Sequence, residues 1–197
     1  MPLQQKYSID FPQEFVASAS VPPTLPSRAR TLRYVGGVTR VLNERILARI
    51  EKLLDHSSTE EIGLFVTSPG GATGSAMSFY DTIRHVLTPN LVTIGSGEVD
   101  SSGFIIFLSG SRRYVSARTT GLLHSCGRVF GSQRYTTAEM AAMLAEDTLK
   151  DRQYATVLSE NSRGRLCVED VLLMMQRNTV LSAEDFIRFG FADEIIK

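Results

Sequence analysis

Three short segments of this chain contain the residue types that acyl transfer requires. Ser101 is a candidate hydroxyl nucleophile, and His124, which ends the apolar stretch 121–124, is a candidate general base. The segment Ser68-Pro69-Gly70-Gly71 contains two glycines, which adopt backbone angles closed to other residues and can bring an N–H close to a ligand carbonyl. Together the segments predict an oxyanion site, a nucleophile and a base.

Each segment also has a structural interpretation when it is taken alone. Ser101 stands where a strand is expected to lead into a helix, and serine is a common helix N-cap. A histidine at the end of an apolar strand is usually a structural residue, and Pro-Gly is typical of an ordinary turn. Ser102 offers a second hydroxyl, but the Ser-x-Gly spacing favours Ser101 as the nucleophile.

The elements that must position these residues alternate between strands and helices with short connections. This alternation predicts an α/β fold. Strands are expected at 31–35, 62–67, 91–96, 114–116 and 122–124, helices at 43–54, 75–87, 102–109, 168–176 and 183–189, and a closing segment at 191–196.

A long helix is predicted to begin after Thr136 and to end near Leu158. Thr136 precedes Glu139 by three residues, which is the spacing of a capping box. One face of this helix is apolar, and two interpretations of that face stay open. It packs within the domain, or it projects and packs against another subunit; the face carries Met140, Met143, Leu144 and Leu149.

Composition limits the classes of partner. The chain has 197 residues with 43% hydrophobic and 21% charged content, which fits one globular domain. Lys+Arg and Asp+Glu number 21 each, which disfavours nucleic acid or an anionic membrane as the main partner. The arginines of Arg28/Arg30 and Ser111-Arg112-Arg113 are therefore expected on the solvated surface. Residues 1–29 hold most of the prolines and are interpreted as an extended arm ahead of a domain over 30–197.

Targeting and redox signals favour a cytoplasmic protein. The longest apolar run, Phe104–Leu108, is too short to span a bilayer, and the first residues include Asp10 and Glu14 without an apolar stretch typical of a secretory signal. Cys126 and Cys167 lack metal-ligand spacing, which favours a reducing compartment. Cys126 is interpreted as a small packing residue in preference to a reactive thiol.

The order of the short motifs resembles one family. From about Arg30 to Lys197 the chain is similar to the proteolytic subunit of the ATP-dependent Clp protease, the ClpP family of serine peptidases with the crotonase-like superfold. The matching motifs are Arg30-Thr31-Leu32, Gly36-Gly37, Ser68-Pro69-Gly70-Gly71, Phe79-Tyr80-Asp81-Thr82, Ser101-Ser102-Gly103, His124, Leu181-Ser182-Ala183-Glu184 and Gly190-Phe191-Ala192-Asp193.

The resemblance implies a role for each matched residue. Ser101 would be the nucleophile and His124 the general base, and the backbone N–H groups of Gly71 and Ser102 would form the oxyanion hole. It also implies repeated β-β-α units with a projecting handle helix at about 130–160, stacked heptameric rings, and polypeptide substrates delivered by an AAA+ unfoldase. Since the sequence has no Gly-x-x-x-x-Gly-Lys loop, that ATPase would be a separate chain. No metal or organic cofactor is implied.

Three departures from the family pattern affect the expected activity. Asn178 stands where the family has its catalytic Asp; its amide can orient the imidazole but carries no charge, so weak activity is expected from a Ser101–His124–Asn178 site. Asp100 replaces a small apolar residue and brings a negative charge near the oxyanion site. Ser125-Cys126 replaces Gln-Pro beside the substrate groove.

Two rival functions remain from the sequence. Asn178 and Asp100 favour a weakly catalytic or non-catalytic structural subunit that joins an active paralogue in a mixed ring. An acyl-CoA enzyme of the related crotonase group also uses a backbone oxyanion hole, but the pairing of Ser101 with His124 argues against that class.

Overall fold

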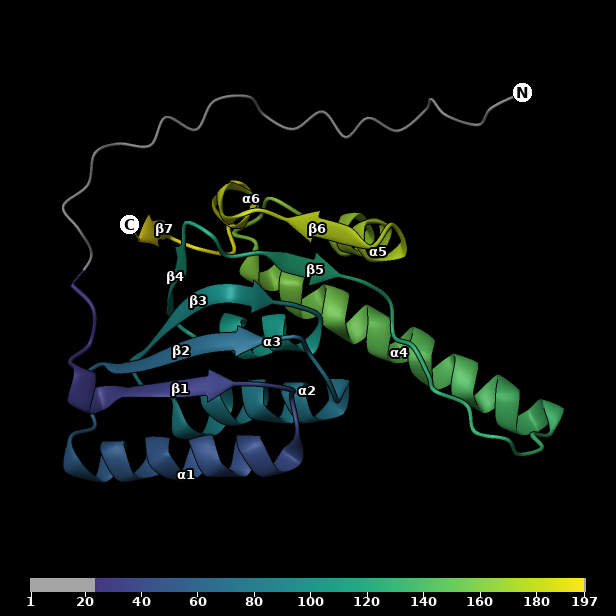
Figure 1. The fold of residues 1–197 in the computed structure, drawn as a ribbon, viewed down its shortest axis with the longest axis horizontal. Coiled ribbons are helices and arrows are strands. Elements are labelled where there is room, and N and C mark those ends of the chain that lie inside the picture. Colours follow the sequence, from purple (N-terminus) through teal and green to yellow (C-terminus); the bar gives the residue numbers. More distant parts are fainter. Residues whose placement is uncertain (1–23, 197) are drawn as a thin grey trace.

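A five-stranded parallel sheet in the order β1-β2-β3-β4-β7 organises the molecule (Figure 1). The computed structural model describes residues 24–196, so the predicted arm at 1–29 lies almost entirely outside the described residues. The predicted α/β class is confirmed, and the strand positions follow the sequence-based expectation closely. The strands are β1 Thr31–Val35, β2 Ile62–Ser68, β3 Leu91–Val99, β4 Arg112–Ser116 and β7 Glu194–Ile196.

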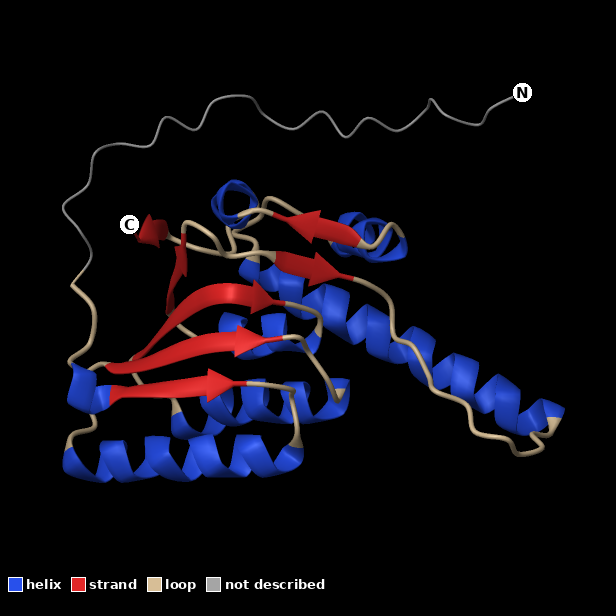
Figure 2. Ribbon diagram, viewed as in Figure 1, coloured by secondary structure: helices blue, strands red, loops and turns tan. Residues whose placement is uncertain are grey.

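Helices α1 Arg40–His56, α2 Thr73–Asp81 and α3 Ser102–Leu108 pack against one face of this sheet (Figure 2). The α1 helix buries Ile46 and Ile50, which lie one turn apart on its apolar face. The predicted helix over 75–87 is divided, because α2 continues into a π-helical segment, Thr82–Leu87, that ends in a left-handed residue, Thr88.

The α3 helix is buried along its whole length, which fixes the position of the residue that precedes it. Phe104 of α3 stacks on Phe186 with ring centroids 4.8 Å apart, and it meets Phe191 edge-on at 5.0 Å. Aromatic pairs of this kind add about 1 kcal/mol each to the area that they bury. The start of α3 is therefore attached to the most densely packed part of the core.

A second layer of structure lies beyond the strand β3 and holds the C-terminal half of the chain. β5 Gly121–Leu123 pairs antiparallel with β6 Thr179–Leu181, and the helices α5 Val168–Gln176 and α6 Ala183–Arg188 flank β6. The predicted cap of α6 is confirmed, since the Ser182 hydroxyl accepts a hydrogen bond from the Asp185 N–H. The predicted bounds of α5 are confirmed at both ends.

The α4 helix, Thr137–Asn161, extends well beyond the sheet (Figure 1). Its predicted capping box is present, with the Thr136 hydroxyl and the Glu139 carboxylate each bonded to the other residue's N–H. The inner end is buried at Tyr154 and Leu158. The outer apolar face is not packed within the domain, because Met140, Leu144 and Leu149 are 51%, 69% and 57% exposed. Packing of this outer face within the domain is therefore wrong, and its packing against another subunit stays a prediction.

Arg113 corrects the expectation that the Arg112-Arg113 pair lies on the solvated surface. Arg113 is only 6% exposed, and its guanidinium donates to Phe191 O at 2.6 Å, Asn161 Oδ1 at 2.9 Å and Asn161 O at 3.1 Å. Longer bonds reach Gly110 O and Gly190 O. Burial, and then repulsion by nearby Arg163, lower the pKa of Arg113 to about 10, which leaves the group protonated at neutral pH. The guanidinium is surrounded by oxygen acceptors, and the spacing of residues along the sequence does not predict that these acceptors come together.

We expect Arg113→Met to lower the free energy of unfolding by about 3–5 kcal/mol, because several buried carbonyl oxygens lose their donors together. Urea unfolding followed by circular dichroism measures the change. Arg118→Met is the matched control, since Arg118 is exposed on the same side of the chain and should change stability by less than about 0.5 kcal/mol. A loss below about 1 kcal/mol for Arg113→Met would contradict the structural role of this residue.

Candidate active site

The carboxyl ends of β2 and β3 bring two of the three predicted segments together. Because neighbouring parallel strands end at the same edge of a sheet, the residues after them share one surface. The Asp100 N–H donates to Ser68 O at 2.9 Å, which joins the residue after β3 to the last residue of β2. The Ser101 N–H donates to Leu122 O at 2.8 Å and so brings the β5 segment to the same place.

The two glycines of Ser68-Pro69-Gly70-Gly71 have the positive φ angles that their prediction requires, +94° at Gly70 and +150° at Gly71. A Cβ on Gly70 would lie 2.6 Å from the Ser101 Cβ, so only glycine allows this approach. Val38 bonds the residues on either side of Gly71, through Gly70 O at 2.7 Å and the Ala72 N–H at 3.0 Å. In such a parallel bridge the Gly71 N–H faces away from Val38. In the described part of the chain this N–H has no acceptor.

Ser101 has a strained backbone with φ 52° and ψ −130°, a combination of angles that residues other than glycine rarely adopt. It precedes α3 as the N-cap residue, yet its side chain makes no capping hydrogen bond. The alternative interpretation of Ser101 as an ordinary capping serine is therefore wrong. A serine on a sharp, strained strand-to-helix turn is the arrangement that exposes a nucleophilic hydroxyl in α/β hydrolases. The sequence did not predict this strain, because Val99 stands where the Gly-x-Ser-x-Gly pattern of such turns has its first glycine.

Ser102 and Ser101 differ in accessibility. Ser102 is 1% exposed and its hydroxyl has no hydrogen-bond partner, whereas Ser101 is partly exposed. A substrate carbonyl can approach the Ser101 hydroxyl but not a fully buried one. As the first residue of α3, Ser102 has a backbone N–H without an intrahelical acceptor. Ser102 follows Ser101 directly, and Gly71 follows Gly70, which lies against Ser101. The N–H groups of Gly71 and Ser102 are both unbonded among the described residues.

His124 follows directly after β5 and is partly exposed. Its Nδ1 lies 2.8 Å from Ser125 O. Because a carbonyl oxygen can only accept, this contact places the proton on Nδ1 and leaves the lone pair on Nε2. That tautomer is the one that a base acting through Nε2 needs. In the described residues no hydrogen bond joins His124 to the Ser101 hydroxyl, and catalytic hydrogen bonds are often long before substrate binds.

Asn178 lies opposite His124 across the β5–β6 pair. The register pairs Leu123 with Thr179, and its extension by one residue places His124 beside Asn178. Asn178 is exposed and has φ 51°, a left-handed conformation that asparagine tolerates at the end of a helix. Its N–H donates to Met175 O at 3.1 Å. The register thus brings residue 178 beside His124, but among the described residues its amide forms no hydrogen bond with that imidazole.

The α4 helix contacts the segments that carry Ser101 and His124. The buried Tyr154 hydroxyl donates to Ser101 O at 2.8 Å, and burial raises the pKa of Tyr154. The Asp151 carboxylate accepts from the Cys126 N–H at 2.7 Å, two residues beyond His124. The sequence did not predict these contacts. A tyrosine on the buried face of the helix was the available signal for the first of them, because a buried tyrosine hydroxyl usually has a hydrogen-bond partner.

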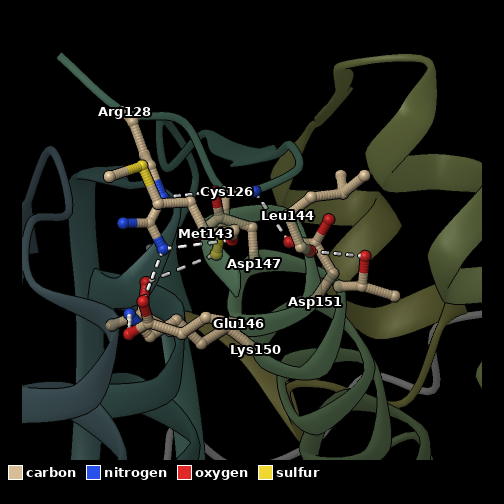
Figure 3. A network of polar contacts seen from close by, with 10 residues as sticks. Cys126, Arg128, Met143, Leu144, Glu146, Asp147, Lys150 and Asp151 are labelled. Carbon is tan, nitrogen blue, oxygen red and sulfur yellow. Dashed lines mark hydrogen bonds and ion pairs between the residues drawn. The ribbon is translucent and has the colours of Figure 1, made fainter. Parts of the chain in front are cut away.

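The segment that follows His124 runs along α4 and is held there by charged pairs (Figure 3). Arg128 donates to Asp147 and to Glu146, both at 2.6 Å, and Lys150 pairs with Glu146 at 2.5 Å. Hydrogen bonds to these two carboxylates raise the pKa of Arg128. Mainly burial, with help from Asp151, raises the pKa of the Cys126 thiol to about 11. That thiol is protonated at neutral pH, which agrees with its interpretation as a packing residue.

A search of residues 24–196 for other types of site gives two findings. No group of three or more His, Cys, Asp and Glu side chains in this range is arranged to hold a metal ion. None of the helices in this range combines the length and the apolar character needed to cross a membrane.

Comparison with known proteins agrees with this geometry. The family model described as Clp protease matches residues 25–197. The chain is 28% identical to "ATP-dependent Clp protease proteolytic subunit 4" of Rhodococcus jostii (80% of this chain and 87% of the relative) and 30% identical to "ATP-dependent Clp protease proteolytic subunit 2" of Tropheryma whipplei (78% and 83%). It is also 28% identical to "ATP-dependent Clp protease proteolytic subunit" of Lactococcus lactis (85% and 83%). The chain therefore belongs to the Clp protease family.

Proposed function

We propose that this protein is a serine endopeptidase subunit of a self-compartmentalised, ATP-dependent protease that cleaves unfolded polypeptides. One observation carries the proposal: Ser101 has a strained backbone at the start of α3, and its side chain forms no capping bond. The N–H groups of Gly71 and Ser102, which have no acceptor among the described residues, support it as the proposed oxyanion hole. Strain of this kind persists where a site needs a hydroxyl in one fixed orientation. The family membership supports peptide cleavage as the reaction.

The reaction follows from the positions of these groups. The Ser101 oxygen attacks the carbonyl carbon of the peptide bond while His124 Nε2 takes the hydroxyl proton. The Gly71 and Ser102 N–H groups donate to the oxyanion of the tetrahedral intermediate. The imidazolium then gives its proton to the leaving amine as the C–N bond breaks. Water repeats the sequence on the acyl-enzyme and releases the carboxylic acid and free Ser101.

Asn178 is expected to make this activity weak. In a serine protease triad, an Asp-to-Asn change costs about 10⁴ in turnover, largely because the amide favours the wrong imidazole tautomer. Here Ser125 O already accepts from Nδ1, which favours the productive tautomer without the help of residue 178. What the site lacks at residue 178 is negative charge near the imidazolium. We therefore propose a slow peptidase.

We further propose that the subunit assembles into stacked rings through the outer face of α4. The exposed apolar side chains of Met140, Leu144 and Leu149 support this, because a monomer gains nothing from placing them in water. An AAA+ unfoldase on a separate chain would deliver large substrates to the chamber. Two cysteines without a disulfide, Cys126 and Cys167, support a cytoplasmic location.

Leu144→Glu is expected to break this assembly. A buried carboxylate at the centre of an apolar contact is costly, so the mass in solution, measured by light scattering after gel filtration, should fall from that of a double ring to that of a single ring or smaller. Leu144→Met is the matched control because it keeps the apolar surface, and it should leave the mass unchanged. Wild-type protein that is monomeric at every concentration would count against the proposed architecture.

The rival function is a structural subunit in a mixed ring with an active paralogue, and the uncharged, unbonded Asn178 amide favours it. Hydrolysis of a short fluorogenic peptide by the purified chain separates the two functions, since such a peptide needs no unfoldase. Measurable turnover supports the endopeptidase. Ring assembly without turnover, with hydrolysis gained only after mixing with an active paralogue, supports the structural subunit instead.

A further inference from the structure

Asp100 is the one carboxylate in the segment that carries Ser101, and its backbone is fixed on both sides. Its N–H donates to Ser68 O at 2.9 Å, and its C=O accepts from the Gly103 N–H at 2.8 Å. The first bond ties Asp100 to the end of β2, and the second ties it to the first turn of the buried helix α3. Because both bonds hold the Asp100 backbone to buried elements, the direction of its Cα–Cβ bond is fixed.

That side chain faces the β5 segment. The end of β3 runs parallel to residues 120–122, with Glu98 bridged to Thr120 and the Val99 N–H bonded to Thr120 O at 2.9 Å. The Leu122 carbonyl accepts a hydrogen bond from the Ser101 N–H at 2.8 Å, and the Leu122 amide lies near enough to the Asp100 carboxylate to lower its pKa. Leu122 is two residues from His124, and the Asp100 carboxylate interacts electrostatically with that imidazole. The segment that ends at His124 therefore has Asp100, after β3, as one neighbour and Asn178, before β6, as another.

We propose that Asp100 supplies the negative charge that Asn178 cannot, and so stabilises the imidazolium that forms on His124 during the reaction. The proposal rests on the proposed endopeptidase function. It makes Asp100 a positioning residue, since its carboxylate acts on the base and not on the substrate. The family pattern has its carboxylate at position 178, next to β6. In this chain the carboxylate that acts on the imidazole is Asp100, next to β3.

The charged and titratable groups around Asp100 come from three elements. Glu98 lies on β3, His124 follows β5, and Tyr154 reaches the carboxylate from α4. Burial, and then repulsion by Glu98, raise the pKa of Asp100, while the Leu122 amide and His124 lower it. The carboxylate is charged above its pKa, so falling pH removes the charge sooner than it would from an ordinary aspartate. The same partial burial strengthens its interaction with the imidazolium relative to an exposed pair.

Asp100→Asn tests the proposal because it removes the charge and keeps the shape. At pH 8 we expect kcat/KM for the fluorogenic peptide to fall about tenfold with little change in KM, which corresponds to a single partly screened charge near the imidazolium. The acid limb of the pH profile should move to lower pH, because loss of a negative neighbour favours the uncharged imidazole. A purely structural role would not move this limb.

Two further variants make the test specific. Glu98→Gln removes an equal charge two residues away and should leave the pH 8 value within about twofold. Asn178→Asp should raise kcat/KM by a larger factor in the Asp100→Asn background than in the wild type, because in that background it supplies the only carboxylate beside His124 and not a second one. Melting temperature and ring mass check that each variant folds, and Asp100→Ser replaces Asp100→Asn if the latter does not assemble.

The outcomes separate this inference from the function on which it rests. An active wild type with Asp100→Asn unchanged overturns the role of Asp100 alone. An equal loss in Glu98→Gln overturns it as well, and so does a gain from Asn178→Asp that is no larger in the Asp100→Asn background than in the wild type. A wild type that neither hydrolyses peptide nor reacts with a fluorophosphonate overturns the endopeptidase function and the inference together.

Discussion

Ser101→Ala is expected to reduce peptide hydrolysis by about 10⁴-fold or more, to the level of the uncatalysed background within the assay. The change removes the partly exposed hydroxyl that precedes the unbonded Ser102 N–H, so no acyl-enzyme can form. Turnover of a fluorogenic peptide, with active-site labelling by a fluorophosphonate as a second readout, measures the effect.

Ser102→Ala is the matched control for this experiment. Ser102 is buried and contributes its backbone N–H, which alanine retains, so we expect turnover within about threefold of the wild type. Equal losses in Ser101→Ala and Ser102→Ala would contradict the assignment of Ser101 as the nucleophile. Full activity of Ser101→Ala would rule out the proposed mechanism.

Asn178→Asp is expected to raise kcat by about 10²-fold. The register across β5 and β6 places this residue beside His124, where a carboxylate can stabilise the imidazolium. The gain should be smaller than the 10⁴ known from serine protease triads, because Ser125 O already holds Nδ1 as a donor. Steady-state kinetics on the fluorogenic peptide measure the change, and a gain confined to kcat would mark a transition-state effect.

The backbone at residue 178 should accept this change. Aspartate, like asparagine, tolerates the left-handed conformation with φ 51° at the end of α5, so stability should change by less than about 1 kcal/mol. Asn178→Ser is a useful control, because it is small and uncharged and should give no gain. A folded Asn178→Asp protein with unchanged turnover would mean that residue 178 has only a structural role, in the turn between α5 and β6.

Much of the fold could be predicted because its signals are local. Apolar periodicity located α5 at its observed bounds, and hydroxyl–carboxyl spacing identified the caps of α4 and α6. Arg113 shows the limit of such reasoning. Two adjacent arginines suggest a solvated surface, but the carbonyl oxygens that surround Arg113 come from residues about fifty to eighty positions away in the chain. Their convergence depends on tertiary packing, which leaves no periodic trace in the sequence.

In the candidate site, too, some features could be predicted from the sequence and others could not. Gly71, Ser101, Ser102 and His124 stand out because their residue types have chemical uses at strand ends, and the structure places them at adjoining positions. The contacts of Ser125 O with the imidazole and of Tyr154 with Ser101 O could not be predicted. One involves a main-chain oxygen that every residue possesses, and the other joins residues from distant segments.

The central claim is that Ser101 is a nucleophile in a formed oxyanion site. Incubation of the wild-type protein with a fluorophosphonate, followed by peptide mass spectrometry, tests it most directly, because the Ser101 oxygen would displace fluoride and retain the phosphonyl group even if turnover is slow. We predict a single adduct on Ser101, with none on Ser102 and none in the Ser101→Ala variant. A wild-type protein that stays unlabelled, or an adduct on another residue, would contradict the claim.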